Sequence, residues 1–321
     1  MLHNMDTAIR RPLYAHPGSW NDPDMLYIGA GDFDARHLTE ARSHFSIWAM
    51  LNAPLIIGYD LRTAAPELME ILGNEEIIAL NQDPAGNQAV LAYDSSDVNI
   101  LVKTLASGEK AVAVLNRTSH PLSATLTASH LKFTADSDIV LIDLWSGEER
   151  QFRDRQDLEL APRETLVFRA SGTRALADGS YLSEMPGSVN PAVDGVIAPQ
   201  ADPMVHRSIL PWVGTRVSRE GPRYGGWGGA QADSTPYSQQ LAIAGRSFDT
   251  GIGVLANSRL EVRNAGYRRF SALVGVDDSA RDRSQPVTFE VYADGRLVAR
   301  SPEMRFGDEP AALDADVSDA R

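Results

Sequence analysis

The sequence contains no cysteine, which excludes disulfides, thiolate metal sites and cysteine nucleophiles together. It is also short of positive charge: 43 Asp and Glu stand against 30 Lys and Arg, a formal net charge of −13. A chain of that sign repels phosphate backbones, so we expect no nucleic acid and no anionic membrane surface as a partner. This charge balance suits a neutral substrate.

Long apolar runs are missing as well. The polar start, residues 1–12, has no stretch of the signal-peptide type. The most apolar run, residues 48–57, is too short and interrupted to cross a bilayer, which takes about 20 residues. Residues 1–11 have a helical pattern with no capping signal ahead of it, and residues 313–321 have a strand pattern with no closing turn. We therefore expect the chain to be cut at both ends.

What is present is enough for a folded protein. Hydrophobic residues make up 43% of the 321 residues, so the chain can bury a core and long disorder is not expected. At roughly 150 residues per domain, this length predicts about two domains.

Residues 1–86 predict alternating strands and helices. A turn-flanked apolar run at 19–29 precedes an amphipathic helix over 38–51, and a β-branched run at 54–58 precedes a helix that begins near Pro66. This order is the repeating unit of a parallel (β/α)8 barrel. Two such units cannot close a barrel of eight, so we expect an incomplete piece of a larger barrel.

An incomplete barrel would leave apolar surface uncovered. We expect the run at 54–58 and the helix positions Phe45 and Trp48 to be exposed, because neighbouring units that would cover them are missing.

Beyond residue 86 the hydrophobic period changes to two. Residues 87–170 predict a small antiparallel β domain, and the polar, glycine-containing segment 171–180 predicts a linker. Residues 181–321 are again strand-like and predict a β-sandwich, incomplete at its C-terminus. The predicted fold class is α/β plus all-β.

The densest chemical signal is the run Trp20-Asn21-Asp22-Pro23-Asp24-Met25. Two carboxylates at i and i+2 on a strand lie about 6.5 Å apart on one face, within reach of the paired-carboxylate geometry of glycoside hydrolysis. Alternatively, Pro23 breaks the strand and Asp22 accepts backbone N–H groups in an Asx turn. The residue types alone leave both interpretations open.

The surroundings of this run carry a resemblance. HPGSWNDPDMLYIGAG (16–31), SHFSIWAMLNAPLIIGYDLR (43–62) and NEEIIALNQDPAGNQ (74–88) resemble the α-galactosidase (melibiase) family of glycoside hydrolases, family 27. The resemblance implies a (β/α)8 barrel followed by an antiparallel β domain, with 19–26 as the seventh barrel strand and 54–58 as the eighth. It also implies that Asp24 holds sugar hydroxyls and that the adjacent Met25 belongs to the substrate-binding site.

The same resemblance implies that no catalytic residue lies in this chain. The family's nucleophile and acid/base aspartates lie on the fourth and sixth strands, upstream of Met1. One departure is Tyr59, where the family usually has Asn. That difference affects the rim after the last strand.

The third part resembles a second family. YLSEMPGSV (181–189) and the strand-like segments between residues 248 and 298 are similar to the NPCBM family of carbohydrate-binding modules, which are β-sandwiches often joined to glycosidases. This resemblance implies further strands after Arg321. For Asp277 and Asp278 we favour capping of a turn over a Ca²⁺ site.

The remaining motifs are weaker. The seven histidines show no metal-ligand spacing, so we expect no metal. Asn116-Arg117-Thr118 matches a glycosylation sequon beside a strand. The glycine-rich segment 224–229 could stack a sugar on Tyr224 or Trp227, but aromatics that cover a core are the favoured interpretation.

We therefore predict part of a retaining α-galactosidase, inactive by itself, that removes terminal α-linked galactose from oligosaccharides or polysaccharides. Its partner is a galactose-containing carbohydrate, with no cofactor, because protons and carboxylates suffice. The alternatives are a non-catalytic carbohydrate-binding protein, an α-N-acetylgalactosaminidase and a β-L-arabinopyranosidase. The full-length protein is expected to be secreted.

Overall fold

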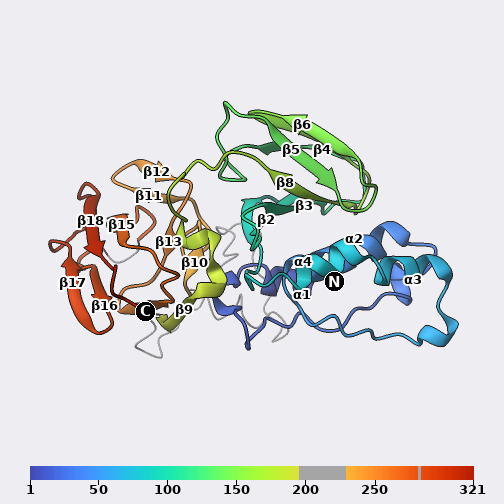
Figure 1. Ribbon diagram of the computed structural model, residues 1–321, viewed down its shortest axis with the longest axis horizontal. Helices are drawn as coiled ribbons and strands as arrows, with labels where there is room; N and C mark the ends of the chain where they lie inside the picture. The colour runs from blue at the N-terminus through green and yellow to red at the C-terminus, as the bar shows by residue number, and fades with distance from the viewer. Residues whose placement is uncertain (195–228, 281–282) are drawn as a thin grey trace. The chain divides into compact units, whose positions relative to one another are not determined.

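The computed structural model describes residues 1–194, 229–280 and 283–321, and the chain divides into two compact units, Met1–Gly187 and Ser188–Arg321 (Figure 1). Tyr224 and Trp227 lie outside the described residues. Among the described residues, no helix is long and apolar enough to cross a membrane.

Helices dominate the start of the first unit. The predicted amphipathic helix is present as α2, and Pro66 opens the next helix, as expected from its favoured place in a first turn. The Asn74 side chain caps the following helix by accepting the Ile77 N–H at 3.0 Å. The helices are α1 (Leu2–Ala8), α2 (Leu38–Met50), α3 (Pro66–Leu72) and α4 (Glu75–Asn81), with short 3₁₀ turns at Pro12–Tyr14, Gly31–Phe33 and Leu61–Thr63.

The two predicted barrel strands are reduced to one parallel bridge, between Leu26 and Ile57. The Leu26 N–H donates to Ile56 O at 2.8 Å, and the Gly58 N–H donates to Leu26 O at 3.0 Å. The two runs are thus parallel neighbours, as expected. They do not extend into regular strands, because a parallel ladder gains its stability from further strands and Pro23 brings no N–H to it.

The expectation that Phe45 and Trp48 are uncovered is wrong. Both side chains are only 1% exposed, in a hydrophobic cluster that includes Leu101, Ala113 and Val167 of the β domain. A sheet face therefore takes the place that we had assigned to missing barrel units.

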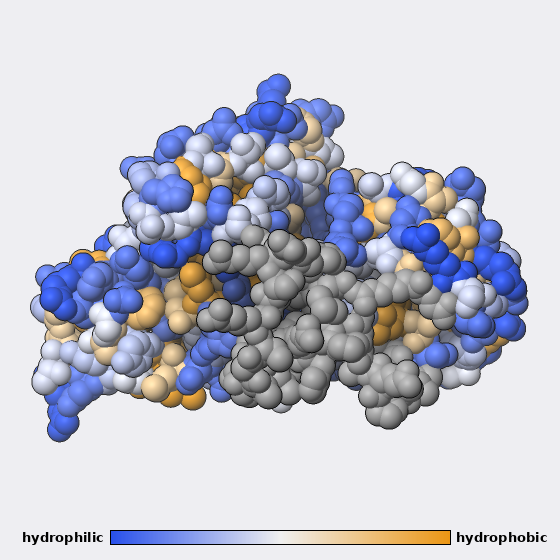
Figure 2. Space-filling model, turned by 180° about the vertical axis from the view of Figure 1, so that it is seen from behind, coloured by the Kyte–Doolittle hydropathy of each residue, from blue (hydrophilic) through white to orange (hydrophobic). Residues whose placement is uncertain are grey.

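The run at 54–58 is exposed in part, as expected, since Ile56 is 61% exposed. Figure 2 shows that apolar residues also reach the surface of the helical part of this unit.

The predicted antiparallel β domain is confirmed. Its six-stranded sheet has the order β1-β2-β3-β8-β5-β6, and β4 pairs with β7 separately. Every residue of the central strand β3 is buried, because one face packs on α2 and the other contributes Val112 and Val114 to a second core. The strands are β1 (Val90–Asp94), β2 (Val98–Thr104), β3 (Lys110–Asn116), β4 (Leu122–Thr127), β5 (Ile139–Asp143), β6 (Glu149–Phe152), β7 (Arg155–Leu160) and β8 (Thr165–Ser171).

After β8 the chain stays on the β domain. The Ala175 N–H donates to Lys132 O at 2.9 Å, and the buried Glu184 carboxylate accepts from Lys110 Nζ at 2.5 Å. Glu184 also pairs with Arg174 at 3.2 Å. The segment expected as a linker and the first residues expected in the module therefore belong to the first unit, which includes the 3₁₀ turn Leu182–Glu184. The 3₁₀ turn Pro186–Ser188 spans the boundary between the two units.

The second unit is built from antiparallel strand pairs, as its alternating pattern predicts: β9 with β14, β10 with β13, β11 with β12, β15 with β18 and β16 with β17. The described strands are β9 (Val189–Asp194), β10 (Gln231–Ala232), β11 (Leu241–Ile243), β12 (Arg246–Phe248), β13 (Ile252–Gly253), β14 (Ser258–Val262), β15 (Arg269–Val274), β16 (Glu290–Ala293), β17 (Arg296–Arg300) and β18 (Ala311–Asp316).

The acidic pair of this unit caps a turn, as we favoured. Asp277 accepts from the Ala242 N–H at 2.9 Å, and Asp278 accepts from the Ala244 and Gly245 N–H groups at 3.0 and 2.8 Å. Ala244 and Gly245 both have positive φ, the conformation of a two-residue hairpin turn.

Candidate sugar-binding site

The motif loop, residues 20–25, is held by side chains that donate hydrogen bonds to its backbone carbonyls, and not by a strand ladder. Asp24 has a φ of 78°, a left-handed conformation that a non-glycine residue keeps only under local restraint. The restraint is visible: Trp48 Nε1 of α2 donates to Asp24 O at 2.7 Å, and Asn4 Nδ2 of α1 donates to Pro23 O at 3.0 Å. Two helices thus fix the chain on both sides of the Pro23–Asp24 bond.

The two carboxylates of the loop are both exposed and accept different backbone N–H groups. Asp22 Oδ1 accepts the Asp24 N–H at 2.9 Å, which is the Asx turn that we had set against a catalytic pair. Asp24 Oδ1 accepts the N–H of Met25 at 2.8 Å, and its side chain is exposed. The geometry therefore gives Asp22 a role in the turn, and both carboxylates remain exposed to solvent.

Met25 and Tyr59 each pack on a glycine at the end of the opposite run, 54–58 or 19–29. A Cβ added at Gly58 would clash with Met25 Sδ, and a Cβ added at Gly29, whose φ is 102°, would clash with the Tyr59 ring. Each large side chain thus lies on a glycine of the other segment. Because Gly29 has no side chain, it leaves room for the ring of Tyr59, the residue that departs from the family's usual Asn. Met25, next to Asp24 in the sequence, is 44% exposed.

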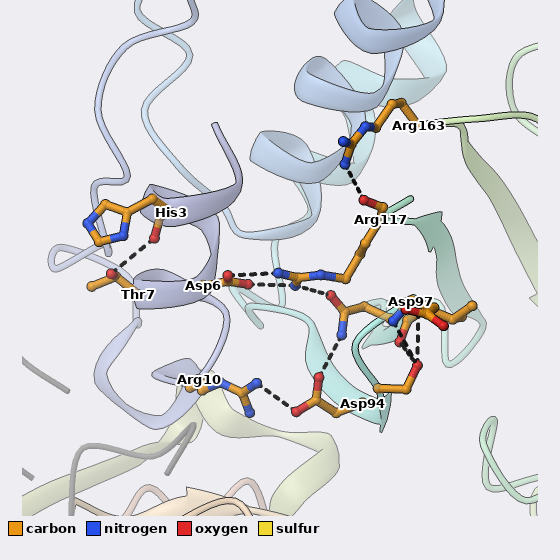
Figure 3. Close-up of polar contacts among 11 residues, drawn as sticks. His3, Asp6, Thr7, Arg10, Asp94, Asp97, Arg117 and Arg163 are labelled. Atoms are coloured by element: carbon orange, nitrogen blue, oxygen red, sulfur yellow. Dashed lines mark hydrogen bonds and ion pairs between the residues drawn. The ribbon is translucent and has the colours of Figure 1, made fainter. Parts of the chain in front are cut away.

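Helix α1 is tied to the β domain by a network of ion pairs (Figure 3). The Arg117 guanidinium donates to both oxygens of Asp6, at 2.6 and 2.8 Å, and Arg10 pairs with Asp94 at 2.6 Å. Asn99 joins the two pairs, because it accepts from Arg117 at 2.6 Å and donates to Asp94 at 2.8 Å. The bond to Asp6 raises the pKa of Arg117.

Two buried basic groups were not anticipated from the sequence. His44 is 1% exposed and lies between Phe33 and Trp48, with ring centroids 4.9 and 4.1 Å away, and neither ring nitrogen has a hydrogen-bond partner among the described residues. Burial lowers the pKa of His44 to about 3. Its position four residues before Trp48, on one helix face, is the signal that indicates burial.

Lys103 of β2 is fully buried beneath the helices. Its ammonium donates to Asn52 Oδ1 and to Leu80 O at the end of α4. Burial lowers the pKa of Lys103 to about 7.

The sequon asparagine is engaged inside the fold. Asn116 Nδ2 donates to His120 O and Ala161 O, both at 2.8 Å, and its Oδ1 accepts from the N–H and hydroxyl of Thr118. Its side chain has no solvent-exposed surface. Within the described part of the chain, no group of three or more His, Asp or Glu could hold a metal ion.

Three family models match this chain. "Alpha galactosidase A" matches residues 5–83, "Alpha galactosidase C-terminal beta sandwich domain" matches 95–170, and "NPCBM/NEW2 domain" matches 212–321. The resemblance to the α-galactosidase family is confirmed. So is the resemblance of the last part to an NPCBM module.

Individual relatives agree with the family match. Alpha-galactosidase A of Aspergillus niger is 36% identical over 53% of this chain and 30% of its own length. Alpha-galactosidase 3 of Arabidopsis thaliana is 42% identical over 42% of this chain and 31% of its own. Among solved structures, alpha-galactosidase I from Mortierella vinacea has 28% identity and a TM-score of 0.47, over 50% of this chain and 41% of that one. The chain spans about a third of the length of the curated relatives it matches.

Proposed function

We propose that this chain supplies part of the sugar site of a retaining α-galactosidase, in which Asp24 and Met25 contact a terminal α-linked galactose. The observation that carries the proposal is an exposed Asp24 carboxylate on a backbone fixed from two helices. The match to α-galactosidase sequences over residues 5–83 supports it.

The chemistry of Asp24 is that of a hydroxyl acceptor. An ionised carboxylate accepts hydrogen bonds from two neighbouring sugar hydroxyls, and such charge-assisted bonds are stronger than neutral ones. Met25 offers an apolar, polarisable surface beside it.

The two carboxylates of the double displacement are proposed to come from outside these 321 residues, so that this chain alone is inactive. Retention needs a nucleophile and an acid/base roughly 5–5.5 Å apart. Asp22 is committed to a turn, and Asp24 is assigned to the sugar. The exposed row Met25, Tyr27 and Ile56, at 44%, 47% and 61%, supports further barrel strands packing on this edge.

The coding sequence before the Met1 codon tests this part of the proposal. We expect it to continue in frame and to encode two aspartates at the ends of predicted strands, and the longer protein to hydrolyse an aryl α-galactoside. The 321-residue chain should give no turnover above buffer, because the source of the rate enhancement is missing. An in-frame stop codon directly before Met1, or clear turnover by the chain alone, would overturn it.

The roles of the two aspartates are tested in that longer protein. Asp24→Asn should weaken galactose binding about ten-fold or more, because the amide replaces an acceptor with a donor at a charge-assisted bond worth about 1.5–3 kcal/mol. Asp22→Asn should bind galactose and show a lower melting temperature. If Asp24→Asn binds normally and Asp22→Asn alone abolishes binding, the assignment is reversed.

A further inference from the structure

Gln88 occupies a buried position between the helical part of the first unit and its β domain. It lies just before β1 and has no solvent-exposed surface. Both ends of its amide are used: Nε2 donates to Ala8 O at the end of α1, at 2.9 Å, and Oε1 accepts from Asn21 Nδ2 at 2.8 Å. A fully buried amide with both ends satisfied fixes the groups on each side of it.

Asn21 extends this contact into the motif loop. Its amide donates to Arg11 O at 2.8 Å as well as to Gln88. Asn21 is thus fastened to the chain that follows α1 and to the chain that enters the β domain. Asp24 stands three residues farther on, with its carbonyl oxygen held by Trp48.

The other side of the loop also depends on the β domain. Asn4 of α1 holds Pro23 O, the Arg117–Asp6 pair holds α1 itself, and the Arg10–Asp94 pair holds the chain just after it (Figure 3). The loop is therefore supported at Asn21 and at Pro23, and both supports trace back to the β domain.

We propose that Gln88 is a positioning residue for Asp24, through which the β domain holds the sugar-binding loop in place. The inference rests on the proposed function for its significance. Its structural content, the coupling of Gln88 to the Asp24 backbone, holds or fails without any sugar.

Gln88→Met tests the coupling in the full 321-residue chain, since methionine keeps the length of the side chain and removes both hydrogen bonds. The reporter is the indole N–H of Trp48, which donates directly to Asp24 O. Its exchange with solvent is followed by NMR, with the signal assigned by Trp48→Phe. The indole N–H of Trp145 is an internal reference, because it donates to Ser46 Oγ at 3.0 Å, away from the loop.

Asn87→Leu is the matched control. Asn87 is buried next to Gln88, but its amide donates to Thr104 O at 3.0 Å and accepts from the Gly187 N–H at 3.1 Å. It therefore loses a comparable pair of buried bonds with no partner in the motif loop, and it reports what general destabilisation alone does.

We expect Gln88→Met to speed exchange at the Trp48 indole about tenfold, and Asn87→Leu to leave it near the parent value. Asn21→Ala, at a partly exposed position, should give the same effect as Gln88→Met, and the double variant should add little to either. Asn21→Ala also decides the matter if Gln88→Met does not fold.

Two results would overturn the inference. One is equal acceleration of the Trp48 and Trp145 signals in Gln88→Met or in Asn21→Ala, which would mean general loosening. The other is an Asn87→Leu effect as large as that of Gln88→Met. If the proposed α-galactosidase function were wrong, the exchange rates of the two indole N–H groups would be unaffected, so the two proposals can fail independently.

Discussion

Acid should weaken the first unit through His44. Burial holds the folded pKa at about 3, whereas the ordinary value is 6.5. The unfolded chain therefore takes up a proton at this residue before the folded chain does. The stability that His44 permits is fully present above about pH 6.5 and is lost as the pH falls toward 3.

The size of this loss follows from the two pKa values. At about pH 4 the protonated form of the unfolded imidazole outnumbers the neutral form by about 300 to 1, while the folded imidazole is still mostly neutral. This difference corresponds to a loss of about 3 kcal/mol in the free energy of unfolding. That is a large fraction of the 5–15 kcal/mol typical of a domain.

His44→Leu removes the titration. Urea unfolding followed by far-UV circular dichroism, at about pH 7 and about pH 4, gives the free energy of unfolding for each protein. We expect the parent to lose about 3 kcal/mol more than His44→Leu between these conditions. The carboxylates titrate in both proteins, so their contribution cancels.

His3→Leu is the control, because His3 is exposed on α1 and water solvates it in both states. Its acid loss should match that of the parent. Equal acid losses in the parent and in His44→Leu would refute the reasoning, since they would show that the buried ring finds a partner or solvent in the folded protein.

The stability of the unmodified chain should rise between about pH 7 and 10.5, because buried Lys103 is neutral in the folded chain while the unfolded amine keeps its proton. Lys103→Met should abolish that rise in urea unfolding titrations. An unchanged dependence of stability on pH would contradict this prediction. Gly29→Ala should lower stability by about 1–3 kcal/mol, because its φ of 102° strains a residue that carries a Cβ and that Cβ would clash with the Tyr59 ring. Gly179→Ala should change stability little, and equal unfolding midpoints for the two variants would contradict this. Folded protein from a glycosylating host should carry no glycan at Asn116, and a glycopeptide in its mass spectrum would contradict this.

Local patterns predicted the parts of the fold that local energetics decide. Helix α2 follows its apolar spacing, α3 begins at its proline, and the strands of the β domain follow the period of two. The runs at 19–29 and 54–58 have equally strong strand patterns but form a single bridge. Strand formation depends on neighbours that a sequence pattern cannot supply.

The candidate site shows the same division. Residue types predicted the motif that contains Asp24 and the Asx turn of Asp22, and the resemblance implied the role of Asp24. The positive φ of Asp24 and its contacts with Trp48 and Asn4 were not, because they join residues about 20 positions apart. Gln88 lies 67 positions from Asn21, and no local spacing indicates that contact.

The expectation that Phe45 and Trp48 are exposed was wrong because the first unit is not divided at residue 86. We divided the chain where its hydrophobic period changes, at about residue 86, and did not expect the β domain to cover the apolar surface of the first part. The structure instead places charged groups across that division: Lys103 reaches Leu80 O, and Arg117 reaches Asp6. A buried hydrogen-bonding group that loses its partner costs about 1–3 kcal/mol, so such contacts favour folding of both sides together. The helices and the β domain therefore share one core, and the motif loop is anchored to the helices and to the chain that enters the β domain.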